Sequence, residues 1–125
     1  MKLTKNFSLH EFACKDEHNT PVPIGYRNNV QLLANNLQVL RDEVGVPIHV
    51  NSGYRTPSYN KSVGGVKNSF HLTAMAADIT IKNKTPRQVK LLIKKLIRTG
   101  KMKKGGIGLY AGFVHYDVRG YNAEW

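Results

Sequence analysis

The segment "HLTAMAADITI" occupies residues 71–81 and carries two patterns at once. From Ala77 to Ile81 every second residue is apolar, and Asp78 and Thr80 lie between them, which is the alternation of a half-buried strand. Aspartate is depleted from strand interiors, so Asp78 needs a reason beyond folding. The segment therefore predicts a strand that presents a carboxylate, with a histidine seven residues before it.

A second strand of the same character lies near the end of the sequence, in "GFVHYDVRG", residues 112–120. Alternation puts His115 and Asp117 on one face of this strand and the apolar Val114 and Val118 on the other. If the two strands are neighbours in a sheet, their imidazoles and carboxylates converge.

His71, Asp78 and His115 together have the ligand count of a catalytic zinc site, in which the fourth position is left to water. The sequence contains neither HExxH nor CxxC, so a second interpretation stays open. In that interpretation the histidines are ordinary polar residues and Asp78 is a capping or salt-bridged aspartate. Cys14 is the only cysteine, which excludes a cysteine-based zinc cage.

The signals elsewhere predict a small sheet with helices packed on it. Apolar residues recur at helical spacing from Arg27 to Val44, and another helix begins at Thr85 and Pro86 and stops at Gly100. A short helix in "NFSLHEF" and strands in "PIHVNSGY" and "GGIGLY" complete the order helix, helix, strand, strand, helix, strand, strand. Consecutive C-terminal strands favour antiparallel pairing, so we predict an α+β fold with a mostly antiparallel sheet.

Length and composition set further bounds. The 125 residues contain no obvious linker, which predicts one domain over residues 1–125. The chain is 41% hydrophobic and 22% charged, as in globular proteins, and no run approaches the roughly 18–20 apolar residues of a membrane helix. The segment "MKLTKNFSLHEFACKDEH" has charges where a signal peptide has its apolar part, so no signal peptide is predicted.

The chain is strongly basic, with 19 Lys and Arg against 8 Asp and Glu and a formal net charge of +11. Ten of the cations lie between Lys82 and Lys104. Such a field favours an anionic partner, namely nucleic acid, an acidic membrane surface or an anionic cell-wall polymer, unless it is only a solubilising face. Charge alone does not choose among these partners, but a nucleic-acid partner is disfavoured because the lysine-rich helix lacks interleaved aromatic residues.

Two long segments carry a resemblance to a known family. They read "SGYRTPSYNKSVGGVKNSFHLTAMAADI" and "GGIGLYAGFVHYDVRG", and similarity extends back through "NLQVLRDEVGVPIHVNSGYR" to "NFSLHEFAC". In this order they resemble the M15 family of zinc D-Ala-D-Ala peptidases, and within it the short single-domain branch of bacteria and their phages. The hedgehog/DD-peptidase fold that this implies agrees with the α+β order above.

The resemblance also implies a set of site residues. The family's S-x-H-x6-D motif matches Ser69, His71 and Asp78, and its last ligand histidine matches His115. One zinc ion per chain would then be bound by the two histidines and the aspartate. The arginine of S-G-Y-R matches Arg55, which implies that it holds a carboxylate or the polarised carbonyl of the substrate, and Ser69 is expected to bind substrate as well.

The chain departs from the family pattern at two positions. Many relatives have a catalytic Asp or Glu three residues before the last histidine, where this chain has Gly112, and a glycine is common where it has Ala74. Asp117 is the best substitute for the missing acid, because it lies two residues from His115 on the same strand face. It would act either as the general base or as the group that orients His115 through the other ring nitrogen.

These expectations combine into a zinc-dependent peptidoglycan hydrolase that cuts bonds next to D-amino acids in stem peptides or cross-links. A carboxypeptidase and an endopeptidase, including a phage endolysin, both fit. The alternative is a catalytically inactive wall-binding module on the same scaffold. Gly112 supports this alternative, because it stands where many relatives have a catalytic acid. A monomer is expected, made in the cytoplasm and acting at the cell wall after release by a phage or as part of a virion.

Overall fold

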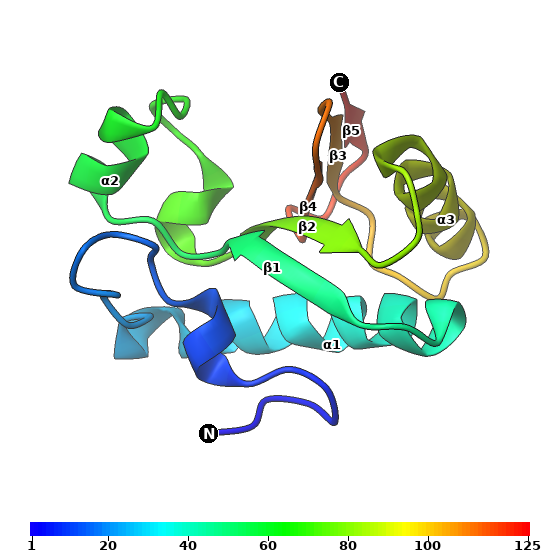
Figure 1. The fold of residues 1–125 in the computed structure, drawn as a ribbon, viewed down its shortest axis with the longest axis horizontal. Coiled ribbons are helices and arrows are strands. Elements are labelled where there is room, and N and C mark those ends of the chain that lie inside the picture. Colours follow the sequence, from blue (N-terminus) through cyan, green and yellow to red (C-terminus); the bar gives the residue numbers. More distant parts are fainter.

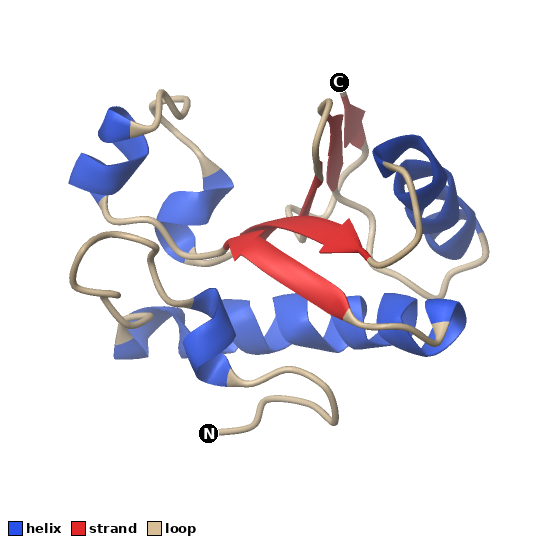
Figure 2. Cartoon of the chain, in the orientation of Figure 1, coloured by secondary structure: helices blue, strands red, loops and turns tan.

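The computed structural model describes residues 1–125, and its helices and strands are arranged as Figures 1 and 2 show. The elements are η1 (Leu9–Phe12), η2 (Ile24–Tyr26), α1 (Arg27–Val44), β1 (Ile48–Ser52), α2 (Pro57–Ser62), η3 (Phe70–Thr73), β2 (Ala76–Ile81), α3 (Pro86–Arg98), β3 (Gly106–Leu109), β4 (Val114–Asp117) and β5 (Ala123–Glu124). The five strands form one sheet in the order β1-β2-β4-β3-β5, antiparallel except for the β3–β5 pair. The predicted α+β class is confirmed.

Local signals account for the helix boundaries. Ser8 and Glu11 form a capping box at η1, and Thr85 and Gln88 form another at α3. Gly45 ends α1 in the left-handed conformation with φ of 68°, which glycine adopts without a steric penalty. None of the helices is long and apolar enough to cross a bilayer.

The two faces of the sheet differ in chemistry. The cross-strand pairs Ala77–Tyr116 and Ile79–Val114 of β2 and β4 are buried on one face and belong to a core cluster of 24 residues that includes apolar side chains of α1 and α3. The residues between them in sequence point to the other face, and these include the pair formed by Asp78 and His115. Side chains of α1 and α3 pack in the cluster on the first face, and the site residues Asp78 and His115 lie on the opposite one.

The structure contains elements that the sequence patterns do not predict. Residues near the C-terminus are expected to fray, but Ala123 and Glu124 pair in parallel with β3 as β5. The Trp125 amide then donates to the Ile107 carbonyl at 3.1 Å, and the Trp125 carbonyl accepts from Leu109 at 2.9 Å. That expectation of fraying is therefore wrong, because this segment extends the sheet.

Candidate metal centre

One row of residues across four strands builds the site. In the sheet register Ser52 of β1 lies beside Asp78 of β2, Asp78 beside His115 of β4, and His115 beside Gly108 of β3. Because residues in register share a face, this row sets a carboxylate and an imidazole side by side.

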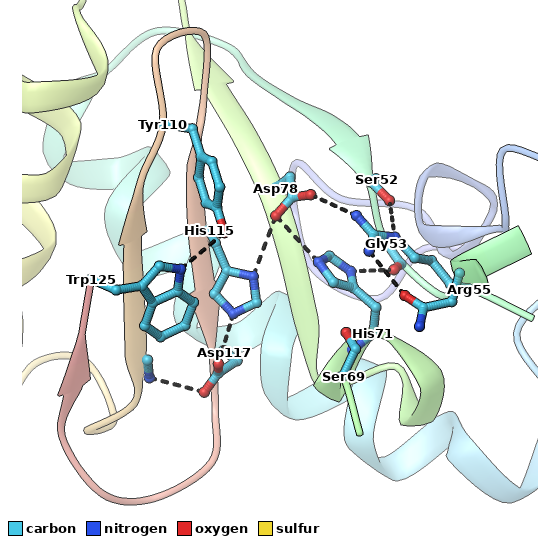
Figure 3. Close-up of polar contacts among 12 residues, drawn as sticks. Ser52, Gly53, Arg55, Ser69, His71, Asp78, Tyr110, His115, Asp117 and Trp125 are labelled. Carbon is cyan, nitrogen blue, oxygen red and sulfur yellow. Dashed lines mark hydrogen bonds and ion pairs between the residues drawn. The ribbon is translucent and has the colours of Figure 1, made fainter. Parts of the chain in front are cut away.

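His71 completes the group from outside the sheet. One ligand atom from each of His71, Asp78 and His115 lies within 4.8 Å of the others. Oδ1 of Asp78 is 3.2 Å from Nε2 of His71 and 3.3 Å from Nδ1 of His115. All three side chains are buried, and Figure 3 shows the two rings on either side of the carboxylate. The structure thus brings together the three residues that the sequence singles out.

The outer nitrogens of both rings are occupied, and this selects the tautomers. Nδ1 of His71 lies 2.7 Å from the Gly53 carbonyl oxygen, which can only accept, so Nδ1 carries the proton. Nε2 of His115 donates in the same way to the Asp117 carboxylate at 2.7 Å. The nitrogens that face Asp78 therefore carry lone pairs. Two neutral imidazoles and a carboxylate fit a divalent transition metal such as zinc.

A short turn positions His71. The Ser69 hydroxyl caps η3 by accepting from the His71 amide at 3.1 Å. Ala74 ends the turn in the left-handed conformation with φ of 60°, which explains why glycine is favourable at this position. Ser69 also lines the cleft above the site.

Arg55 holds the far side of Asp78. Its Nη2 donates to Oδ2 of Asp78 at 3.0 Å, while its Nε donates to Ser52 at 3.1 Å and its Nη1 to Asn60 at 3.1 Å. Oδ1 of Asp78 therefore faces the two histidines. Arg55 also lines the cleft.

Electrostatics favour the charged carboxylate. Burial alone raises the pKa of Asp78, but when a proton instead of a metal occupies the ring nitrogens that face it, hydrogen bonds with His115 and His71 outweigh burial and hold that pKa below its usual value. Burial lowers the pKa of His115, and its contacts with Asp117 and Asp78 reverse the effect, so that pKa is raised. A cation at this point meets a carboxylate that stays ionised at neutral pH.

Asp117 lies on the ligand face, as alternation predicts, but beneath His115 and fully buried. Its Oδ1 accepts from the Gly106 amide and from Nε of Arg119, both at 2.9 Å. Its Oδ2 accepts from His115 and, at 2.8 Å, from Nη2 of Arg119. Both oxygens are occupied, and Asp117 does not line the cleft. This geometry favours the orienting role over the general base.

A cleft of about 270 Å³ opens above the three ligands. Its walls include Arg55 and the Val63–Val66 loop on one side and Tyr110, Phe113 and Trp125 on the other. Neither Tyr110 nor Trp125 is among the site residues that the sequence predicts. The one residue that could have indicated an aromatic ring at this place is Gly108, which has no side chain to fill the space. Its position opposite His115 becomes clear only from the strand register.

Comparison with known proteins agrees with this geometry. The sequence profile of the family described as Peptidase M15 matches residues 5–117, which is most of the chain and includes all three candidate ligands. None of the curated proteins matches the chain. M15 peptidases depend on a metal, and the His71, Asp78 and His115 group can bind one. The chain belongs to the peptidase M15 family and is a metallopeptidase.

Proposed function

We propose that the protein is a zinc-dependent peptidoglycan hydrolase that cuts peptide bonds next to D-amino acids in stem peptides or cross-links. The observation that carries the proposal is the pair of imidazole lone pairs and the Asp78 carboxylate at the floor of a cleft that Arg55 also lines. A zinc ion there would supply a water nucleophile at neutral pH and polarise the scissile carbonyl. The resemblance of the motifs to D-Ala-D-Ala peptidases supports the substrate class.

Arg55 is proposed to hold a carboxylate or carbonyl oxygen of the substrate. A guanidinium has five N–H groups, and the bonds to Ser52, Asn60 and Asp78 use three of them. The remaining N–H groups of the guanidinium are available to an oxygen of a substrate in the cleft. A hydrogen bond from a charged donor is stronger there than one from a neutral donor. Arg55 would thus orient the ligand Asp78 and the substrate together.

Arg55→Lys is expected to lower kcat/KM by about 10², because lysine keeps the charge but cannot make three bonds and still present a planar fork. Zinc content at saturating metal should stay near one per chain, since all three ligands remain. Steady-state kinetics and metal analysis measure the two effects, with Arg87→Lys, an exposed arginine of α3, as the matched control. Full activity in Arg55→Lys would restrict Arg55 to a structural role.

The basic surface is proposed to attract anionic wall polymers. Between Asp78 and Asp117 the sequence has no acidic residue, and the ten cations of residues 82–104 lie in this interval. Glu124 pairs with Lys90 at 2.8 Å and Lys94 at 3.2 Å, and the other cations of α3 and the following loop are exposed. Attraction over such a surface acts on encounter and is screened by salt over about 8–10 Å.

Purified peptidoglycan, incubated with the zinc-loaded protein and analysed by mass spectrometry, tests the proposal. We expect fragments cut next to D-amino acids, and none in the presence of a chelator. Digestion of intact walls should fall with added salt more steeply than cleavage of a soluble stem peptide, because only the wall presents a polyanionic surface. Binding to walls without any cleavage would instead support the inactive wall-binding module.

A further inference from the structure

An aromatic wall faces Arg55 across the cleft. Tyr110 and Phe113 stack at the tip of the β3–β4 hairpin, with ring centroids 4.5 Å apart. The indole of Trp125 lies 5.0 Å from the His115 ring, and both Tyr110 and Trp125 line the cleft. Figure 3 shows Tyr110 extending toward His115 and Trp125.

Trp125 is held in place from several directions. Its backbone is bonded to Ile107 and Leu109 of β3 on both sides. Gly108 leaves room for the ring, because a Cβ there would lie 2.6 Å from the indole nitrogen. The Arg119 guanidinium lies 5.3 Å from the ring centroid on another side. The indole nitrogen therefore has a defined position beside the metal ligands.

That nitrogen fixes the Tyr110 hydroxyl. Nε1 of Trp125 donates to the Tyr110 oxygen at 2.9 Å. An indole N–H can only donate, so the phenol accepts here and keeps its own hydrogen for another acceptor. No other side-chain or backbone group of the protein bonds to this hydroxyl, and the residue is 42% exposed. A donor is thus presented in the cleft with no partner in the protein.

We propose that the Tyr110 hydroxyl donates a hydrogen bond to the carbonyl oxygen of the bound peptide, and that Trp125 is the residue that positions it. The inference rests on the proposed peptidase function and adds a donor on the wall opposite Arg55. A peptide in the cleft would be held between these two donors, above the three ligands. A donor of this kind contributes most when charge develops on the oxygen during attack.

Tyr110→Phe is expected to lower kcat on a soluble peptide ending in D-Ala-D-Ala by about 10², the loss typical of one oxyanion donor. KM should change by less than about threefold, because the bond strengthens mainly in the transition state. Trp125→Phe should lower kcat in the same direction, and the double variant should be no slower than Tyr110→Phe, because the two residues act as one unit. Tyr121→Phe, an exposed tyrosine outside the cleft, is the matched control.

A binding measurement separates this inference from the function on which it rests. Trp125 is the only tryptophan, so its fluorescence reports peptide binding to the metal-free protein. We expect the wild type and Tyr110→Phe to bind the same peptide with similar affinity and to hold zinc equally. If the wild type cleaves the peptide and the Tyr110→Phe variant cleaves it equally fast, the inference about Tyr110 is wrong, while the proposed function stands. The same conclusion follows if the Tyr110→Phe variant loses zinc. If the wild type neither binds nor cleaves it, the proposed function fails and the inference with it.

Discussion

His71→Ala and His115→Ala proteins are expected to lose zinc binding and essentially all peptide hydrolysis. Each variant removes one of the two imidazole lone pairs that face Asp78. Zinc affinity should fall by more than the roughly 10–100-fold that the loss of a ligand's outer partner costs, since a ligand itself is removed. Metal analysis after dialysis and hydrolysis of a stem peptide measure the two losses.

His49→Ala is the matched control, because His49 is an exposed histidine of β1 that does not line the cleft. It should keep both zinc and activity. Thermal unfolding adds an independent measurement: a metal that binds only the folded state at 100 times its Kd stabilises it by about 2.7 kcal/mol. Wild-type protein should therefore melt at a higher temperature with zinc, and neither ligand variant should show the shift. Unchanged zinc content in both variants would exclude this trio as the metal site.

The predictable part of this molecule is what short-range patterns determine. Alternation locates β2 and β4 and puts Asp78, His115 and Asp117 on faces that the structure reproduces. Caps locate α1 and α3, because Gly45 and the pair Thr85 and Gln88 act within one helical turn. The convergence of Asp78 and His115 follows once β2 and β4 are neighbours, and the η3 turn adds His71 from outside the sheet.

The rest depends on contacts that no local pattern reports. A strand of two residues has no period, so β5 and the placement of Trp125 follow only from pairing with β3. The space above Gly108 is a consequence of register, which sets that glycine beside His115. Alternation likewise gives the face of Asp117 but not its partners, Arg119 and the Gly106 amide, which decide what its carboxylate can do.

Asp117→Asn is expected to weaken zinc binding by about 10–100-fold, the cost of losing an orienting partner of a ligand. An amide cannot replace this carboxylate, whose oxygens accept from His115, Arg119 and the Gly106 amide. If its NH₂ group faces His115, the ring must accept at Nε2 and carry its proton on Nδ1, the nitrogen that faces Asp78. If its oxygen faces the ring, the NH₂ group opposes the donors of Arg119 and Gly106. Titration with zinc measures the affinity.

The same variant separates the two roles of Asp117. If Asp117 orients a ligand, the Asp117→Asn variant should regain much of its kcat when zinc is saturating, because mass action restores the occupancy of the weakened site. As a general base, it should bind zinc normally and lose about 10² or more in kcat at every zinc concentration. Tyr116→Phe controls for stability, because it removes a 2.7 Å bond to the Lys103 carbonyl from the opposite face of β4. We expect the first outcome, since a base must reach the cleft and both oxygens of Asp117 are bound beneath His115.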